Sequence, residues 1–161
     1  MRLPFFGRES PPVIGLARPS DAAALAAIHA TGFERGWDVH EFERMIADPA
    51  VVTHLARPGG KGTPTGFALS RVVADEAEIL TVAVKPAARG KGLGKLLLRP
   101  HFGALAARGA RSIFLEVAQD NAPAIRLYQA YGFAEVGRRA GYFRRANGEA
   151  ATAIVMRRAL G

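Results

Sequence analysis

This 161-residue sequence lacks cysteine and has no long apolar run. Without cysteine, the chain has no disulfide framework, no thiolate nucleophile and no cysteine-based zinc site. The histidines also lack the spacing of metal ligands, so we expect no metal; they are His29, His40, His54 and His101.

No stretch of the sequence approaches the roughly 20 apolar residues that a membrane span needs. The opening residues, MRLPFFGRESPP, are interrupted by Pro4 and Gly7 too early for the apolar region of a signal peptide. We therefore expect a cytoplasmic protein that does not act on a membrane.

Acidic residues are the scarcer charge, with 14 Asp and Glu against 22 Lys and Arg and a formal net charge of +8. This balance favours acidic or phosphorylated partners, although an arginine-rich genome would give the same composition. The length suits one domain, and a hydrophobic content of 49% is typical of a globular protein. We expect an N-terminal extension at residues 1–12 and one folded domain at 13–161.

Hydrophobic periodicity predicts strands and helices in an order that indicates an α/β fold. Five strands are expected at 13–17, 51–57, 67–74, 77–84 and 112–118. A sixth strand should begin with residues 133–137, and a seventh is expected at 150–160. The helices are expected from Ser20 or Asp21, at 38–48, from the glycine-rich stretch to Arg108, and between Asn121 and Gly132. Pro100 should kink the third helix. This order implies a mixed sheet with helices on both faces.

The stretch VAVKPAARGKGLGKLLL, residues 82–98, joins an apolar strand to a leucine-rich helix through three glycines and several basic residues. It fits neither the P-loop nor the dinucleotide-binding glycine pattern, and leaves Arg89-x-x-Gly92-x-Gly94 at a helix start. Glycines let backbone N–H groups approach a ligand closely, and a helix N-terminus attracts anions. A merely flexible basic loop would not explain the place of the glycines, so the stretch predicts a phosphate-binding loop.

This motif, followed by FLEVAQDNAPAIRLYQAYGF and GRRAGYF, resembles the GNAT superfamily of N-acetyltransferases. The two later segments are similar to one branch, the bacterial ribosomal-protein N-terminal alanine acetyltransferases. The likeness spans residues 13–160 and is densest at 78–143. It implies a mostly antiparallel seven-stranded sheet that splays open at the acetyl-CoA site. It also implies direct transfer of acetyl from acetyl-CoA to an amine.

The resemblance further implies which residues bind acetyl-CoA. Backbone groups of Val82, Ala83 and Val84 would pair with the pantetheine arm, and Asn121 would contact the same arm. The glycine loop would hold the pyrophosphate; its residues are Arg89, Gly90, Lys91, Gly92, Leu93, Gly94 and Lys95.

Glu116 lies in the apolar strand SIFLEVA, on the face opposite Leu115 and Val117. A carboxylate in such surroundings is costly unless it is paired or partly protonated. One interpretation is a general base, because burial can raise the pKa of a carboxyl group toward neutrality. The other is a glutamate at a strand end that meets solvent or an arginine. The resemblance assigns the matching glutamate as the base that deprotonates the amine, through water.

Tyr128 follows Asn121 by seven residues, which places both on one helix face. A phenol can protonate a departing thiolate, because their reference pKa values of about 10 and about 8.5 lie close together. Tyr128 is therefore either the general acid that the resemblance implies or a core aromatic residue. We expect the core role for Tyr131.

On the acceptor side, the resemblance points to Trp37, Glu78 and Tyr142. Phe33 and Phe42 are similar to groove residues of the family, but core packing fits these two and Trp37 equally well. Glu78 also fits a solvated position at the start of a strand.

We expect the acceptor to be the N-terminal α-amine of a protein such as a ribosomal protein. An α-amino group has a reference pKa near 8, against about 10.4 for lysine, and so loses its proton more easily. The alternatives are the same chemistry on a small-molecule amine or a lysine side chain, and a non-catalytic ribosome- or RNA-binding module. The presence of Glu116, Tyr128 and the whole loop argues against the last, and no direct nucleic-acid binding is required.

Overall fold

The structure, a computed structural model, describes residues 10–32, 36–145 and 147–160. Its seven strands form one sheet in the order β1-β2-β3-β4-β5-β7-β6. Strands β4 and β5 pair in parallel, and the other neighbouring pairs are antiparallel. The strands are β1 Pro12–Leu16, β2 Val51–Pro58, β3 Gly66–Val73, β4 Glu76–Val84, β5 Ser112–Ala118, β6 Ala134–Arg144 and β7 Ala150–Ala159. This architecture confirms the predicted mixed, mostly antiparallel sheet.

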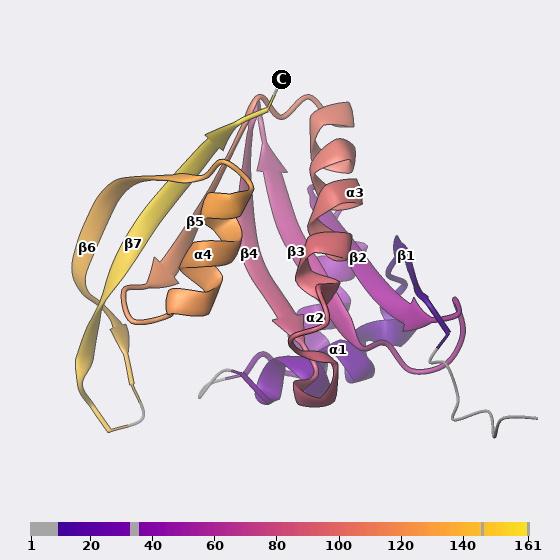
Figure 1. Cartoon of the computed structure of the whole chain (residues 1–161). Helices are drawn as coiled ribbons and strands as arrows, with labels where there is room; N and C mark the ends of the chain where they lie inside the picture. The colour runs from indigo at the N-terminus through magenta and orange to yellow at the C-terminus, as the bar shows by residue number, and fades with distance from the viewer. Residues whose placement is uncertain (1–9, 33–35, 146, 161) are drawn as a thin grey trace, which may run out of the picture.

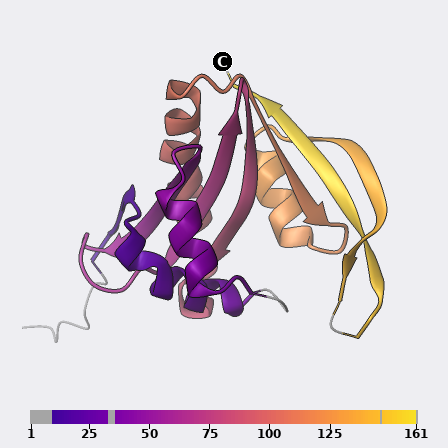
Figure 2. The same ribbon diagram turned by 180° about the vertical axis from the view of Figure 1, so that it is seen from behind.

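Helices cover both faces of the sheet, as predicted. On one face lie α1 and α2, and on the other lie α3 and α4 (Figures 1 and 2). Each face has its own core: Leu25 and Phe42 belong to the first, and Leu97 and Ile113 belong to the second. The helices are α1 Ala22–Ala30, α2 Val39–Ala47, α3 Leu93–Ala107 and α4 Ala122–Ala130, with 3-10 turns η1 Pro19–Asp21 and η2 Pro86–Ala88.

Local side-chain chemistry fixes where two of the helices begin. The Asp38 carboxylate accepts a hydrogen bond from the Glu41 N–H at 2.8 Å, and Glu41 accepts from the Asp38 N–H at 3.1 Å. This reciprocal pair satisfies two backbone donors at the start of α2. Asn121 caps α4 with a single hydrogen bond, because its side chain accepts from the Ala124 N–H at 3.3 Å.

Helix α3 contains Pro100 yet continues without a break to Ala107, so Pro100 does not end it. Proline removes the N–H that would have bonded to the carbonyl of Leu96. Both Leu96 and Pro100 lie on the exposed face of α3, where water can satisfy that carbonyl. The buried face of the helix, with Leu97, Leu98 and Phe102, remains packed against the sheet.

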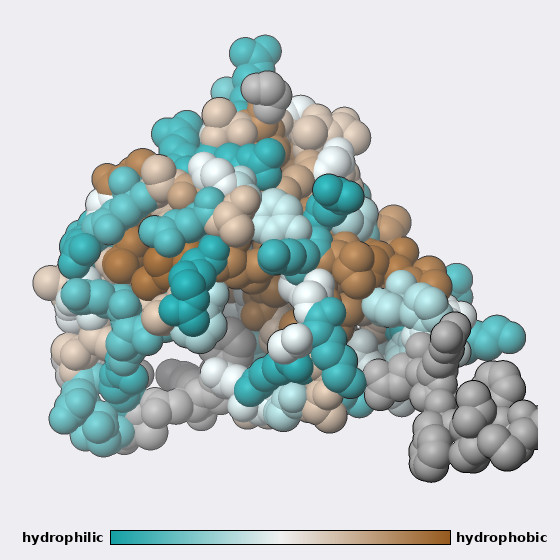
Figure 3. Space-filling view, viewed as in Figure 1, coloured by the Kyte–Doolittle hydropathy of each residue, from teal (hydrophilic) through white to brown (hydrophobic). Residues whose placement is uncertain are grey.

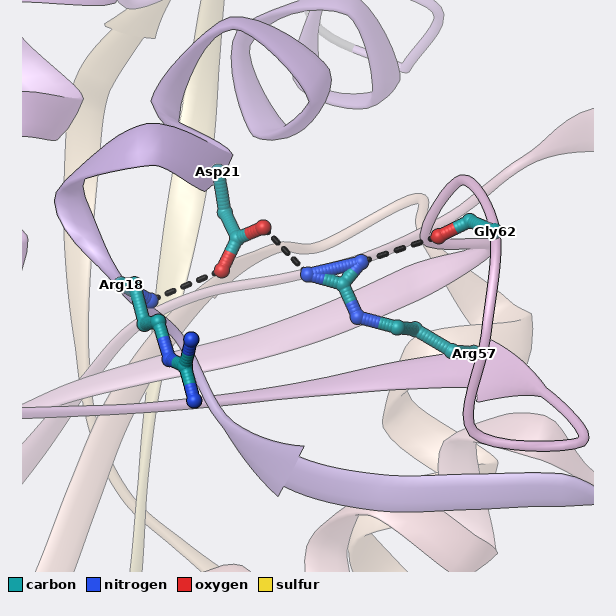
Figure 4. Close-up of polar contacts among 4 residues, drawn as sticks. All are labelled: Arg18, Asp21, Arg57 and Gly62. Atoms are coloured by element: carbon teal, nitrogen blue, oxygen red, sulfur yellow. Dashed lines mark hydrogen bonds and ion pairs between the residues drawn. The ribbon is translucent and has the colours of Figure 1, made fainter.

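A small polar network lies between the turn that precedes α1 and the β2–β3 hairpin (Figure 4). Asp21 accepts from the backbone N–H of Arg18 at 2.8 Å and forms an ion pair with Arg57 of β2. Arg57 also donates to the carbonyl of Gly62 at 3.0 Å, in the loop between β2 and β3. The network connects the turn before α1 to the β2–β3 hairpin, at the end of the sheet away from β6.

Strands β4 and β5 pair only along part of their length. Their register runs from Glu76 opposite Ser112 to Ile79 opposite Leu115, and no further pairing between them follows in the described residues. Strand β4 then continues to Val84 and β5 to Ala118. Figure 1 shows the two strands diverging beside α4. This is the predicted splaying of the sheet.

No helix among the described residues is long and apolar enough to cross a membrane.

Candidate active site

A pocket of about 630 Å³ lies where the sheet opens, between the glycine loop, β4 and α4. Figure 3 shows hydrophobic surface bordered by hydrophilic side chains in the region between α4 and the start of α3. Most of the residues predicted to bind acetyl-CoA line this pocket: Val82, Ala83, Val84, Arg89, Gly90, Gly92, Leu93, Gly94, Lys95 and Asn121. The fold therefore brings the predicted cofactor residues together, and their contacts with the cofactor stay a prediction.

The first turn of α3 presents free backbone donors to this pocket. The first N–H groups of an α-helix have no partner within the helix, and no side chain caps this turn in the described part of the chain. Gly92 has φ +77°, and a side chain built there would meet nothing within 4 Å. This backbone conformation and open space suit a bulky anion such as a pyrophosphate at the helix N-terminus.

Gly94 has a different role, because it allows a close approach between α3 and α4. A Cβ atom at Gly94 would lie 3.3 Å from Leu127 Cδ2, and Leu127 itself lines the pocket. A larger residue at this position would force the end of the Leu127 side chain to shift. The two glycines of the motif therefore serve backbone geometry in one case and packing in the other.

Three predicted cofactor residues have structural contacts that the sequence did not reveal. Lys91 lies on the far side of the loop, where it lines a second pocket of about 330 Å³. Arg89 donates from Nε to the carbonyl of Val84 at 3.0 Å, and so joins the loop to the end of β4. Asn121 caps α4 through its Oδ1 atom, which leaves its amide nitrogen to donate to a ligand.

Tyr128 lines the pocket and also belongs to the core. Its side chain is 7% exposed, and its ring lies 5.6 Å from the ring of Phe133. Burial raises the pKa of Tyr128 to about 12, so the phenol keeps its proton at neutral pH. Tyr131 instead packs on Phe102 and donates to the carbonyl of Lys95 at 2.9 Å, in keeping with the core role expected for it.

Glu116 is the first residue of β5 beyond the segment that pairs with β4, because that pairing stops at Leu115. Leu115 and Val117 are buried on the face of α3 and α4, which places Glu116 on the opposite face. Its side chain is 15% exposed and forms an ion pair with Arg139 at 3.2 Å. The sequence left two interpretations of Glu116, and the arginine pair is compatible with both.

Glu78 lies on β4 close to Glu116 and on the same face. Its register partner in β5 is Phe114, two residues before Glu116. Burial raises the pKa of Glu78, the nearby Glu116 raises it further, and Arg71 and Arg139 counteract part of the increase. The two carboxyl groups therefore interact, and Glu78 is not the freely solvated residue that a strand start suggested.

Strand β4 also carries a bulge next to these carboxylates. Its register with β3 shifts between Leu69 and Ser70, which pair with Thr81 and Ile79, so Leu80 has no partner in β3. Bulges are frequent next to active sites, where they redirect side chains and backbone groups. Here the bulge lies at the point where β4 departs from β5.

Of the aromatic residues predicted on the acceptor side, Tyr142 is 51% exposed and lies next to Arg139, whose guanidinium is 5.1 Å from the ring centre. Trp37 stacks on His29 at 4.8 Å and packs on the core beneath α1 and α2, but it also lines a pocket with Arg71, so its acceptor role stays a prediction. Phe42 is fully buried in the same core and does not line a groove. Phe33 lies outside the described residues.

The site thus has two sides that meet at the opening between β4 and β5. The pocket and Tyr128 belong to the face of α3 and α4, whereas Glu78 and Glu116 belong to the other face. Sequence reasoning missed Arg139 and Arg71, because no local pattern shows which of the many arginines faces the carboxylates. Among the described residues, no group of three or more His, Cys, Asp or Glu side chains could hold a metal ion.

Comparison with known proteins agrees with this geometry. Residues 22–133 match the model of the acetyltransferase (GNAT) family. The Mycobacterium tuberculosis protein named N-alpha-acetyltransferase RimI is 36% identical over 88% of this chain and 90% of its own. The Salmonella typhimurium protein named ribosomal protein bS18-alanine N-acetyltransferase is 41% identical over 56% of this chain and 60% of its own. The crystal structure of the ribosomal-protein-S18-alanine N-acetyltransferase from Escherichia coli superposes with a TM-score of 0.85, at 28% identity, over 94% of this chain and 95% of that one.

Proposed function

Since this chain belongs to the acetyltransferase (GNAT) family and is an acetyl-CoA-dependent N-acetyltransferase, we propose that its acceptor is the N-terminal α-amine of a protein. The observation that carries this proposal is the opening between β4 and β5. It joins a pocket lined by the N-terminus of α3 to a pair of carboxyl groups on the opposite face. An acetyl donor and an amine can therefore approach one another from opposite sides of the sheet.

The residues that fit acetyl-CoA are those of the pocket. The N–H groups at the start of α3, with Arg89 and Lys95, would hold the pyrophosphate by charge and hydrogen bonding. One edge of β4 pairs with β3 and the other with β5. Among the described residues, the pairing with β5 ends at Ile79. Val82 to Val84 can therefore form hydrogen bonds with the pantetheine arm. Bound acetyl-CoA supplies the activated acetyl group, and the residues described here orient it.

Proton transfer is assigned to two side chains on opposite sides of the site. Glu116 accepts a proton from the acceptor ammonium, directly or through a water molecule, and so generates the nucleophilic amine. Tyr128 keeps its proton because burial raises its pKa, and it donates that proton to the sulfur as the C–S bond breaks. No covalent intermediate on the enzyme is needed, in agreement with the absence of cysteine.

The α-amine is favoured over lysine because it needs less help to lose its proton, with a reference pKa near 8 against about 10.4. The names of two relatives support this choice, since they describe α-amine and ribosomal-protein alanine acetylation. We extend the proposal to a ribosomal protein as acceptor and to the cytoplasm as compartment.

The deciding experiment uses labelled acetyl-CoA with a panel of peptides in reactions free of RNA. Peptides with free Ala, Ser or Met N-termini should be acetylated, and mass mapping should place the acetyl group on the α-amine. The matched control is the same peptide with a blocked N-terminus and its lysines free, which should remain unlabelled. Acetylation chiefly on lysine would contradict the proposed acceptor.

A further inference from the structure

Arg139 connects the two acceptor-side residues that the sequence had singled out separately. It extends from β6 over β7 to Glu116 on β5, where the ion pair measures 3.2 Å. On its other side, the guanidinium carbon lies 5.1 Å from the ring centre of Tyr142. A guanidinium in this position has two binding places within reach, one a carboxylate and the other an aromatic face.

An irregularity in β6 produces this arrangement. Arg139 pairs with Ala153 and Phe143 pairs with Ala151, so β6 advances by four positions over the length in which β7 advances by two. Within the extra segment, Gly141 has φ +66°, a conformation that other residues rarely adopt. The distortion leaves Tyr142 half exposed and beside Arg139. Bulges redirect side chains in this way next to active sites.

The exposure of the two partners is unequal. The Glu116 side chain is 15% exposed, whereas that of Arg139 is 57% exposed. An ion pair with so exposed a partner is weak, because solvent screens it and the long side chain loses entropy. Arg139 can therefore leave Glu116 at little cost, whereas Glu116 is held in place by its strand.

The charges around this pair come from two further strands. Glu78 of β4 contributes a second carboxyl group, and Arg71 of β3 contributes a second cation that also pairs with Asp48 at 3.7 Å. An acceptor ammonium would enter this cluster as an additional positive charge. The place beside Glu116 that suits such a charge is the one that Arg139 occupies.

We propose that Arg139 is a positioning residue that occupies the site of the acceptor ammonium at Glu116, and that it leaves Glu116 but keeps its contact with Tyr142 when the acceptor binds. The inference rests on the proposed role of Glu116 as the base. In the enzyme without acceptor, the guanidinium contacts the Glu116 carboxylate. When the ammonium replaces it, one N–H proton passes to the Glu116 carboxylate and the neutral amine attacks the thioester carbonyl carbon. As the C–S bond breaks, Tyr128 protonates the leaving sulfur, and the second proton that the nitrogen loses restores the Tyr128 phenol. The Glu116 carboxylic acid later returns its proton to water.

The exchange makes a specific kinetic prediction. The pH profile of kcat/KM reports the free enzyme, in which Arg139 contacts Glu116, whereas kcat reports the complex, in which it does not. The Arg139→Gln variant should therefore move the acid limb of kcat/KM upward, because a cation that contacts the carboxylate of the free enzyme has been removed. The acid limb of kcat should stay in place. The KM of the peptide should fall about threefold, because a weak competing cation has been removed.

Two further variants make the comparison specific. Arg139→Lys retains the charge and should restore the wild-type limb of kcat/KM. Arg138→Gln removes the adjacent arginine, which pairs with Glu135 and not with Glu116, and should leave both limbs and the KM unchanged. Equal shifts of both limbs in Arg139→Gln would mean that Arg139 stays at Glu116 throughout, and would overturn the inference. So would unmoved limbs or a raised KM.

A measurement without acceptor separates this inference from the proposed function. Carbon-13 NMR can follow the carboxyl group of Glu78, assigned with a Glu78→Gln variant, in enzyme that holds no substrate. Arg139 counteracts the raised pKa of Glu78, so Arg139→Gln should raise that pKa further and Arg138→Gln should not. An unchanged Glu78 titration would reject the position of Arg139 whatever the acceptor is. A wild type that acetylates no peptide N-terminus would instead reject the proposed function alone.

Discussion

The cofactor side and the acceptor side of the site are built by different means. The cofactor side is nearly continuous in the sequence, from Val82 through the glycine loop to Lys95, and residues of α4 complete it. It offers mainly backbone groups and apolar surface. The acceptor side is assembled from charged side chains of four strands, with Arg71 on β3, Glu78 on β4, Glu116 on β5 and Arg139 on β6. A common donor can be bound by a local motif, whereas the chemistry on the amine depends on side chains brought together from distant strands.

If the acceptor side carries the proton chemistry, Glu116→Gln should have the largest effect of the substitutions considered. The amide keeps the size of the side chain but cannot accept a proton, so kcat should fall by about 10²–10⁴ at neutral pH. Raising the pH should recover part of the rate, because more of the amine is already deprotonated. The measurement is kcat/KM against pH for both forms.

Thermal unfolding controls for the alternative in which Glu116 only anchors Arg139. The Glu116→Gln variant should unfold at or above the wild-type temperature, because a mostly buried charge has been removed. A destabilised variant with an unchanged pH profile would show that the carboxylate is structural.

On the cofactor side, Tyr128→Phe should produce the next largest effect, a loss of about 10² in kcat, toward the lower end for a general acid. The raised pKa of the phenol makes it a weak acid, which limits how much its proton can contribute. The ring and its packing on Phe133 are retained, so coenzyme A affinity and fold should be unchanged. Turnover near the wild-type rate would leave Tyr128 as a core aromatic residue only.

A buried histidine gives the cofactor face a pH-dependent stability. His101 of α3 is fully buried, lies 2.7 Å from His54 and 2.6 Å from Ser70, and has a pKa lowered to about 3 by burial and by His54. Because the folded-state pKa is below the unfolded value, this stability is complete above pH 6.5 and is lost as the pH falls toward 3. At pH 5 the loss should be roughly 2 kcal/mol.

Urea unfolding at pH 7 and pH 5 tests this dependence. The variant His101→Gln should show a smaller difference between the two pH values than the wild type. His40→Gln is the matched control, because the His40 side chain is 82% exposed, and it should keep the wild-type difference. The same pH dependence in all three proteins would assign it to other groups, such as His29, whose pKa is lowered to about 4.

The smallest effect is expected from the backbone of the glycine loop. Gly92→Val should weaken coenzyme A binding about tenfold, because a non-glycine residue with positive φ costs roughly 1–2 kcal/mol and the loop will relax away from it. Calorimetric titration with coenzyme A measures this loss. Gly103→Ala on the same helix has equally open surroundings and no positive φ, and should leave the affinity unchanged. Wild-type affinity in Gly92→Val would argue against backbone binding of the phosphates.

Most of the fold followed from periodicity, and the differences lie at element ends. Strand β4 begins at Glu76, one residue before the predicted strand, and β6 continues to Arg144, although only its beginning was predicted. Helix α3 runs through Pro100 to Ala107, and the kink expected there stays a prediction. In each case a tertiary neighbour outweighs the local preference: β5 and β7 supply hydrogen bonds, and the sheet holds the buried face of α3.

The cofactor residues could be predicted because they form a contiguous motif, in which glycine, charge and helix start have meaning at fixed spacing. The sequence by itself determined the order of the strands and helices, and it pointed to a candidate phosphate-binding loop and to the candidates Glu116 and Tyr128. Only the tertiary structure decided that β4 and β5 separate after Ile79 and Leu115, that Glu78 lies near Glu116, and that Arg139 rather than Arg138 reaches it. The physical reason is that pairing register, bulges and side-chain reach across strands arise from long-range packing, which no local spacing encodes.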